Sequence, residues 1–404
     1  MYLEIKRSLK KDLTYNDAKR EILSDREFLK ELELAIGGIG ISENQAIGRC
    51  KKYLGEIAAR CTDTENRLFW SISEYVTRKK IIGSFGNIHY NKEGVRIIKE
   101  LAGKSIINVL PNHRSVFDFM ILSYIIVKET SFMPIITAAS VFDLFPLGSI
   151  FRRWGAYFVR RDEKDPLYFL VLRYYVMLVL KYELVHLFFI EGGRNKEGGY
   201  SNPKTGILEY LLEGAKKHRI KKSIAFIPVN ISYDYVPESN VVVQENASGK
   251  RKHIFNSVIN YATKKNLGNC YINFGNPVKL SPNQINSGRG FAKSLGNSFM
   301  DEIRNLVVVS PISLLCYTLA ESYKKERISL SGFRKRFGTN FERLKKSGMC
   351  VSFVDLKKIM EYIEFAEGKE IIEFDRKRKT IIIGHKKWRL IRYCSNNIRH
   401  LFEI

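Results

Sequence analysis

The stretch SIINVLPNHRSVFDFMILSYIIVK, residues 105–128, joins two apolar runs of different length through a short polar turn. SIINVLP has the length and β-branched content of a buried strand, whereas SVFDFMILSYIIV has the length and periodicity of a helix. The turn NHRS therefore lies at a helix N-terminus, where backbone amides are unpaired. A buried strand that leads directly into a helix is typical of a sheet covered by helices.

The same alternation extends outward from this stretch, from about residue 81 to residue 300. It predicts an α/β fold with a mixed sheet flanked by helices, in which ligands bind at the ends of the strands. The strand-like runs are SIINVLP, MPIITAAS, GAYFVRR, VHLFFIEGG, SIAFIPVNISYDYV, NVVVQ and CYINFG, and the helix-like segments include FDFMILSYIIVK and TGILEYLLEGAKKH.

The flanking regions have a different pattern, so we divide the chain into regions 1–80, 81–300 and 301–404. In the first region, REFLKELELAI and TENRLFWSISEYVTRKKI carry apolar residues at helical spacing, and Ser42 follows a glycine cluster as a helix cap. A helical N-terminal region is therefore expected.

The third region is basic and is expected to be α+β. LLCYTLAESYKKERI, SGFRKRFGTNFERLKK and FVDLKKIMEYIEFAEG predict helices, and EIIEFDRKRKTIIIG predicts a β-hairpin around a charged turn. Residues 371–400 hold nine Lys or Arg against two acidic residues. An acidic partner is expected to bind this region.

Composition limits the kinds of binding partner and the cellular compartment that can be expected for this protein. The 404 residues include 67 Lys plus Arg against 42 Asp plus Glu, a formal charge of +25, which predicts a polyanionic neighbour such as nucleic acid or an anionic membrane. Six scattered cysteines without a CxxC pair are typical of reduced thiols in a cytosolic compartment. The start, MYLEIKRSLKKDLTYND, has no apolar h-region, so we expect no signal peptide.

The longest apolar stretch, residues 169–190, is not expected to cross a membrane. FLVLRYYVMLVLKYELVHLFFI contains Arg173, Lys181, Glu183 and His186, whereas a spanning helix needs about 20 largely uncharged residues. We interpret it as a buried helix followed by a buried strand.

His113 and Asp118 are the candidate catalytic pair. A histidine titrates near neutral pH and can act as a general base, and Asp118, a little more than one helical turn further on, can hold one ring nitrogen. The spacing equally allows a capping histidine and a first-turn acid favoured by the helix dipole. Further motifs are needed to choose between the two readings.

Two further stretches place cations and glycines at strand ends. GAYFVRR ends in Arg160 and Arg161, and guanidinium forks bind phosphate bidentately. FFIEGGRNKEGG, residues 188–199, leads a strand into glycines that allow amides to approach an anion. Its candidate substrate-binding residues are Glu191, Gly192, Gly193, Arg194 and Lys196.

A fourth stretch, AFIPVNISYDYV, carries Pro228 inside a strand-like run. Proline in a strand predicts an edge strand or a bulge.

These four stretches, in this order, resemble the four acyltransferase blocks of the glycerol-3-phosphate acyltransferase family. The resemblance is to its membrane-associated branch together with the dihydroxyacetone-phosphate acyltransferases. NHRSVFD matches the first block at His113, Arg114 and Asp118, and GAYFVRR resembles the second. EGGR matches the third letter for letter, and Pro228 corresponds to the proline of the fourth. The family usually continues EGGR with serine and arginine, whereas this chain has Asn195 and Lys196.

The resemblance implies a glycerolipid acyltransferase-like core and acyl transfer from acyl-CoA or acyl-carrier protein to the sn-1 hydroxyl of glycerol 3-phosphate. His113 is the implied general base and Asp118 its partner. The implied substrate-binding residues are Arg114, Arg160, Arg161, Glu191, Gly192, Gly193, Arg194, Lys196 and Pro228. No cofactor beyond the thioester co-substrate is implied, and the seven histidines show no HxxxH or HExxH spacing for a metal.

Three alternatives remain open. Dihydroxyacetone phosphate and lysophosphatidate are acceptors for the same chemistry, and the motifs do not discriminate the first of them. A non-enzymatic nucleic-acid-binding protein with a winged-helix-like C-terminal module also fits the charge, although it leaves the ordered blocks unexplained. We expect no nucleic acid partner. The basic C-terminal region predicts peripheral association with an anionic membrane surface on its cytoplasmic side.

Overall fold

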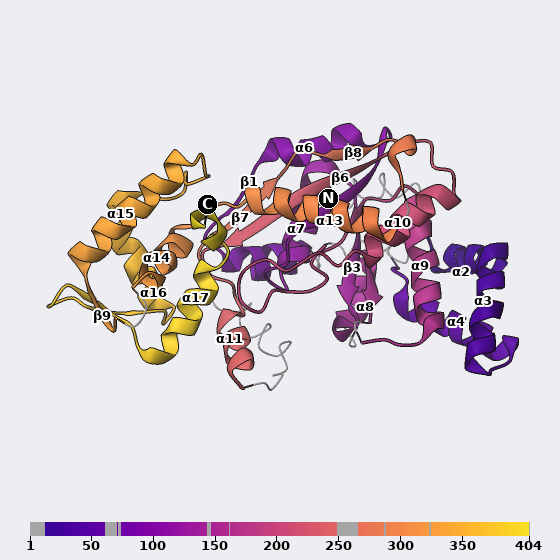
Figure 1. The fold of residues 1–404 in the computed structure, drawn as a ribbon, viewed down its shortest axis with the longest axis horizontal. Coiled ribbons are helices and arrows are strands. Elements are labelled where there is room, and N and C mark those ends of the chain that lie inside the picture. Colours follow the sequence, from indigo (N-terminus) through magenta and orange to yellow (C-terminus); the bar gives the residue numbers. More distant parts are fainter. Residues whose placement is uncertain are drawn as a thin grey trace.

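The computed structural model describes residues 13–60, 71, 74–143, 147–160, 162–248, 266–286, 288–322 and 325–403. A central sheet is covered by helices on both faces. The N-terminal helices lie on one side of this central region and the C-terminal helices lie on the other (Figure 1). The predicted α/β fold with a mixed sheet flanked by helices is confirmed.

The sheet contains eight strands among the described residues, in the order β1-β7-β6-β2-β5-β3-β4, with β8 beside β6. Strands β6, β2, β5, β3 and β4 run parallel to one another, whereas β7 and β8 pair antiparallel with β6. β1 pairs parallel with β7. The bounds are β1 (Ile88–Tyr90), β2 (Ser105–Pro111), β3 (Ile135–Ala139), β4 (Ala156–Val159), β5 (His186–Leu187), β6 (Ser223–Tyr233), β7 (Cys270–Phe274) and β8 (Val278–Leu280).

Each face of the sheet buries its own hydrophobic core, because side chains alternate along a strand. In β2, Ile107 and Val109 join the core beneath α6 (Lys92–Leu101) and α7 (Asp118–Thr130). Ile106 and Leu110 point the other way, into a core formed with α9 (Pro166–Lys181), α10 (Gly206–Lys217) and α13 (Arg289–Asn305). β2 is fully buried, as a central parallel strand must be.

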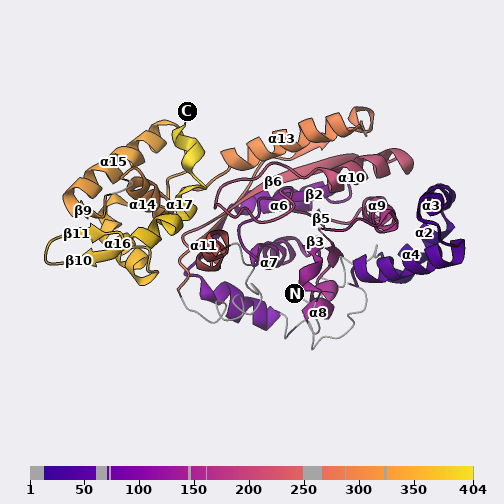
Figure 2. The same ribbon diagram turned by 60° about the horizontal axis from the view of Figure 1, so that its bottom comes forward.

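The N-terminal helices confirm the expected helical region and pack on α9 (Figure 2). They are α2 (Tyr15–Ser24), α3 (Arg26–Ile39) and α4 (Glu43–Ile57). Ser42 caps α4 in a capping box with Gln45, as predicted for this serine. Acidic residues of these helices pair with cations of the central region, for example Asp25 with Lys217 at 3.0 Å and Glu31 with Arg173.

The C-terminal group combines helices with a small antiparallel sheet. Its elements are α14 (Pro311–Ala320), β9 (Arg327–Ser329), α15 (Leu330–Lys346), α16 (Ile359–Gly368), β10 (Glu373–Asp375), β11 (Thr380–Ile382) and α17 (Trp388–Ser395). The predicted hairpin is β10–β11, and β9 adds a third strand that the sequence did not indicate. One continuous core joins this group to the central sheet, from Val307 to Phe402.

Shorter elements complete the described chain. They are η3 (Thr77–Ile81), η4 (Ile82–Ser84), η5 (Ser140–Phe142), α8 (Leu147–Arg153), α11 (Ser239–Ser248), η6 (Pro282–Gln284), η7 (Leu356–Lys358), η8 (His385–Lys387) and η9 (Arg399–Phe402). The stretch 169–190 forms most of α9 and then β5, as expected. Within the described residues, no helix is both long and apolar enough to cross a membrane.

Two local predictions are wrong. The run NVVVQ was expected to be a strand, yet it lies in α11, where the Glu238 carbonyl accepts from Val242 and the valines face inward. Burial overrides the β-propensity of the three valines here.

Pro228 was expected on an edge strand or in a bulge, yet β6 is an interior strand. The Pro228 carbonyl accepts from Gly275, so its ring nitrogen faces the same side of β6. At that point the antiparallel neighbour changes from β8, which ends its pairing at Phe226, to β7, which begins at Val229. No ladder bond is lost because the proline falls in this gap.

Candidate active site

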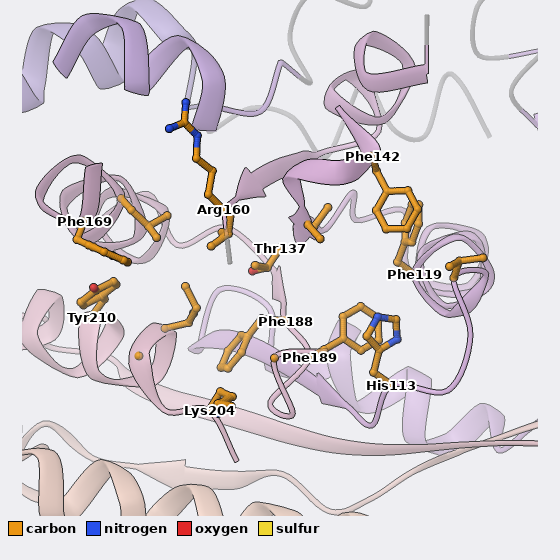
Figure 3. Close-up of a pocket in the computed structure, with 18 residues that line it drawn as sticks. His113, Phe119, Thr137, Phe142, Arg160, Phe169, Phe188, Phe189, Lys204 and Tyr210 are labelled. Atoms are coloured by element: carbon orange, nitrogen blue, oxygen red, sulfur yellow. The ribbon is translucent and has the colours of Figure 1, made fainter. Parts of the chain in front are cut away.

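The C-terminal ends of β2, β3, β4 and β5 surround a pocket of about 460 Å³ (Figure 3). This is where an α/β sheet is expected to bind its ligand. His113 lines one end of the pocket and Arg160 another part of the rim. The wall between them is largely apolar, with Phe119, Phe142, Phe169, Leu172, Phe188 and Ile207.

His113 and Asp118 form the pair that their spacing predicted. The turn after β2 places His113 Nδ1 2.9 Å from Asp118 Oδ2, and Asp118 begins α7. The Asp118 side chain is fully buried, whereas His113 is 13% exposed. The His113 ring stacks on Phe189 with 4.0 Å between ring centroids (Figure 3). Because Nδ1 is engaged, Nε2 is the ring nitrogen left for chemistry.

Asp118 is held by more donors than the sequence suggested. Oδ2 also accepts from the backbone amides of Arg114 at 2.6 Å and Ser115 at 2.8 Å. Oδ1 accepts from the Tyr233 hydroxyl at 2.6 Å. Burial, followed by the Asp118 carboxylate, raises the pKa of Tyr233 well above its usual value, so the hydroxyl remains a donor. The carboxylate is therefore fixed on both oxygens.

Tyr233 was not predicted as a site residue; it ends β6 and lies 115 residues from Asp118 in the sequence. It falls in the strand-like run AFIPVNISYDYV, just beyond Pro228. A polar side chain at the end of a strand next to β2 is the signal that points to it.

Every backbone amide from His113 to Asp118 donates to a protein acceptor. His113 N donates to Glu191 at 3.0 Å and Val116 N to Glu238 at 2.7 Å. The other amides donate to Asp118 or Ser115, as for Phe117 N to Ser115 Oγ at 3.2 Å. Unpaired amides at a helix N-terminus can stabilise an oxyanion. In this structure, these amides already donate to acceptors within the protein.

Arg114 lies behind the pocket and does not line it. Its Nη1 donates to the carbonyls of Gly198 and Gly199, both at 2.5 Å, and its guanidinium lies 4.4 Å from the Tyr200 ring centroid. The residue is only 5% exposed. In this structure Arg114 binds the loop that follows EGGR, and its predicted contact to substrate stays a prediction.

Arg160 lines the pocket, but its guanidinium points away from it toward α4 (Figure 3). Nη1 pairs with Glu163 at 2.5 Å, and Nη2 pairs with Glu56 of α4. Burial opposes the charge of the Arg160 guanidinium, but the two carboxylates outweigh it and raise its pKa. Arg161, the other member of the predicted pair, lies outside the described residues.

The predicted residues Glu191 and Arg194 of the EGGR loop both contact protein groups in this structure. Glu191 is buried and accepts from two backbone amides, His113 N and, at 2.6 Å, Ser201 N. Its predicted contact to substrate stays a prediction. Gly192 lines the pocket at φ 65°, and a Cβ there would lie 2.7 Å from Lys204 Cγ. Glycine is therefore required by both conformation and space.

Arg194 is linked to the catalytic turn through Glu238, which also accepts from Val116 N. Its Nη1 pairs with Glu238 at 2.7 Å, and its side chain is 17% exposed. Gly193 precedes it in the turn, and Lys196 follows it with interactions of its own. Pro228 is buried in β6 and does not line the pocket.

Lys204 is a pocket residue that the sequence analysis missed. Its side chain packs over Gly192 and lines the pocket, and it is exposed. Among the residues that the structure describes, no acceptor or carboxylate pairs with its ammonium group. It is a cation available to an anionic ligand.

A buried polar row lies under the pocket. Thr137 Oγ1 is 2.6 Å from Tyr157 Oη, which is 3.0 Å from His186 Nε2. Burial lowers the pKa of His186 to about 3, so the imidazole is neutral at physiological pH. Thr137 is the member of the row that lines the pocket.

A metal centre has no support in the described part of the chain, where no cluster of His, Cys, Asp or Glu has the arrangement to hold an ion. The chemistry that the site offers is that of a general base beside an apolar pocket with cations at its rim.

Two family models match this chain: Acyltransferase over residues 91–232, and the glycerol-3-phosphate acyltransferase C-terminal region over residues 250–404. The crystal structure of the 1-acyl-sn-glycerophosphate (LPA) acyltransferase PlsC from Thermotoga maritima aligns with a TM-score of 0.37. The two chains share 14% sequence identity, and the alignment covers 59% of this chain and 78% of that chain.

Curated relatives carry the same family name. Glycerol-3-phosphate acyltransferase from Pseudoalteromonas atlantica is 29% identical over 397 residues, 90% of this chain and 47% of that protein. The protein of that name from Aeromonas hydrophila is 27% identical over 411 residues, 95% of this chain and 50% of that protein. The chain spans about half the length of these relatives. Together with the two matching family models, they show that the chain belongs to the glycerol-3-phosphate acyltransferase family.

Proposed function

We propose that this chain transfers an acyl group from a thioester to the sn-1 hydroxyl of glycerol 3-phosphate, which gives lysophosphatidate and a free thiol. The observation that carries the proposal is the His113–Asp118 pair at the rim of an apolar pocket. The names of the curated relatives support glycerol 3-phosphate as the acceptor.

His113 acts as the general base through Nε2. It takes the proton of the acceptor hydroxyl while the oxygen attacks the thioester carbonyl, and Asp118 stabilises the imidazolium through Nδ1–H. The tetrahedral intermediate then collapses, the carbon–sulfur bond breaks, and the thiolate takes the proton back from Nε2. No covalent acyl-enzyme, metal or further cofactor is needed, because the thioester is itself the activated co-substrate.

The apolar pocket holds the acyl chain. Its volume of about 460 Å³ is within the range of small-molecule sites, and Phe119, Phe169 and Phe188 are among its lining residues. Burying the chain there removes apolar surface from water at roughly 25 cal/mol per Å². The reactive carbonyl then lies at the His113 end, which shortens the search for the attacking oxygen.

The phosphate of the acceptor is held by cations at the rim. Lys204 lines the pocket with no described partner, and Arg194 is held near the catalytic turn by Glu238. Arg160 contributes once its guanidinium leaves Glu56 and turns into the pocket. Positioning by such charges lowers the entropic cost of bringing the two substrates together.

Two choices remain within this proposal. The donor is acyl-CoA or acyl-carrier protein, and dihydroxyacetone phosphate differs from glycerol 3-phosphate only at C2. Lysophosphatidate is the third acceptor that the same chemistry serves.

The test measures transfer of radiolabelled glycerol 3-phosphate into organic-extractable lipid, with palmitoyl-CoA and palmitoyl-acyl-carrier protein as separate donors. We expect incorporation with the wild-type protein and its loss in His113→Ala. His385→Ala is the matched control, because His385 is exposed in η8 outside the pocket. Activity that survives in His113→Ala would contradict the mechanism, and wild-type incorporation only with dihydroxyacetone phosphate would change the acceptor.

We also propose that the basic C-terminal group docks on the anionic, cytoplasmic face of a membrane, where the product resides. The turn between β10 and β11 carries Arg376, Lys377, Arg378 and Lys379, all in exposed or half-exposed positions. Reversing these four charges is expected to weaken sedimentation with anionic liposomes, at about 1 kcal/mol per charge near the surface. Unchanged liposome binding, or stronger binding to DNA at matched salt, would count against it.

A further inference from the structure

Glu238 is a buried carboxylate that none of the sequence motifs includes. It precedes α11 and is 0% exposed. Its carboxylate accepts three hydrogen bonds: from Ser115 Oγ at 2.8 Å, Val116 N at 2.7 Å and Arg194 Nη1 at 2.7 Å. A buried charge of this kind is retained only where its donors are in place.

These three donors come from two separate parts of the site. Ser115 and Val116 belong to the turn that carries His113, and Arg194 belongs to the EGGR loop. Glu238 lies 123 residues from Ser115 and 44 from Arg194. One carboxylate therefore joins the turn that carries the general base to Arg194 of the EGGR loop.

Arg194 is only partly used by this contact. Glu238 binds Nη1, and among the described residues nothing is bonded to Nε or Nη2. A guanidinium is a planar fork, so fixing one corner also fixes the direction of the other donors. The Arg194 side chain is 17% exposed, so it is not sealed from solvent.

We propose that Glu238 is a positioning residue that aims Arg194 at the phosphate of the acyl acceptor while it holds the turn that carries His113. This deepens the proposed function and rests on it. Glu238 does not touch the reacting atoms. Its effect reaches the reaction through Arg194 and through the 115–116 turn.

Glu238→Gln separates the two effects. The glutamine carbonyl can still accept from Val116 N, and the Ser115 hydroxyl can rotate to accept from the new amide, so the turn is kept. Val116 N and Arg194 Nη1 share Glu238 Oε1, so the glutamine carbonyl oxygen still faces Arg194, but the negative charge that orients the guanidinium is lost. We expect the KM for glycerol 3-phosphate to rise about ten- to hundredfold, the range for a hydrogen bond to a charged group. The kcat and the KM for the acyl donor are expected to stay within about twofold.

The decisive measurement compares Glu238→Gln, Arg194→Ala and the double variant, with Glu302→Gln on the exposed face of α13 as the control. If Glu238 acts through Arg194, the double variant has the acceptor KM of Arg194→Ala alone. A purely structural role predicts instead that the two effects multiply, and that outcome, or an unchanged KM in Glu238→Gln, would overturn the inference.

Calorimetric binding of glycerol 3-phosphate without donor separates this inference from the proposed function. Wild-type binding that weakens at least tenfold in Glu238→Gln supports the inference whether or not transfer is observed. Wild-type turnover with equal binding by both proteins overturns the inference and leaves the proposed function standing. Wild-type protein that neither binds nor turns over glycerol 3-phosphate overturns both.

Discussion

The two charged parts of the pocket, the His113 end and the Arg160 rim, are constructed differently. At the His113 end, the carboxylates of Asp118 and Glu238 are both fully buried, and each accepts at least three hydrogen bonds. At the Arg160 rim, the guanidinium is 35% exposed and is shared between Glu56 and Glu163. The groups that hold the His113 turn include Tyr233 at the end of β6 and Glu238, the residue before α11. At the Arg160 rim, Glu56 comes from α4.

The difference indicates two tasks. A buried carboxylate with all its donors in place cannot exchange partners without a large cost, so the His113 end is rigid and suits a general base. A half-exposed ion pair contributes only about 0–1 kcal/mol, so Arg160 can exchange a carboxylate for a substrate phosphate. Substitutions at Asp118, Tyr233, Glu56 and His186 test this contrast.

Asp118→Asn should have the largest effect. An amide cannot stabilise the imidazolium as a carboxylate does, and its NH₂ group would face donors, so we expect the transfer rate to fall about 10³- to 10⁴-fold. Asp301→Asn, which alters an exposed ion pair on α13, is the matched control. A loss below tenfold, measured on protein with wild-type circular dichroism, would contradict the assignment of Asp118 as the partner of the base.

Tyr233→Phe should have an intermediate effect. It removes the 2.6 Å hydrogen bond to Asp118 Oδ1, which leaves more negative charge on the oxygen that faces His113. We expect kcat/KM to fall about tenfold, and the acid limb of its pH profile to move to higher pH, because the imidazolium is better stabilised.

Tyr182→Phe is the control for that experiment, because Tyr182 also donates to a carboxylate at 2.6 Å, that of Glu21. Its profile should be that of the wild type. A Tyr233→Phe profile whose acid limb does not move would indicate that this hydroxyl has only a packing role.

Glu56→Gln should have a smaller effect, in the opposite direction. Removing one of the two carboxylates on Arg160 makes the guanidinium easier to release, so the KM for glycerol 3-phosphate is expected to fall by up to about fivefold. Glu100→Gln, which alters an exposed pair with Arg96, is expected to change nothing. A KM that rises in Glu56→Gln would mean that Glu56 orients Arg160 for binding instead of competing with the substrate.

His186→Gln should have the least effect on transfer at neutral pH, because the imidazole is neutral there. Burial lowers the pKa of His186 in the folded state to about 3 from 6.5, so between these pH values only the unfolded chain takes up the proton. The free energy of unfolding is therefore expected to decrease as the pH falls through this window, by up to about 1.4 kcal/mol per pH unit.

Denaturant unfolding of the wild type and of His186→Gln between pH 7 and pH 4.5 measures this contribution. It is the difference between the two proteins in the slope of unfolding free energy against pH. Burial also raises the pKa of Asp234, to about 6, which gives a slope of the opposite sign in both proteins, so only the difference reports on His186. Equal slopes in the two proteins would mean that His186 is protonated in the folded state.

The α/β fold, the helical and basic flanks, and the His113–Asp118 pair could all be predicted from the sequence pattern. These features are local: strand and helix periods are read within a window of residues, and the pair is five residues apart. The ordered blocks identified the family for the same reason, since each is a short contiguous stretch.

The partners of the polar side chains, in contrast, depend on how the chain folds. Tyr233 and Glu238 reach the catalytic turn from more than 100 residues away, Arg114 binds backbone carbonyls instead of lining the pocket, and α4 supplies the carboxylate on Arg160. Chain folding also made NVVVQ helical. Burial is the physical reason: a polar group removed from water takes whichever partner the packed fold places beside it, and sequence distance does not limit that choice.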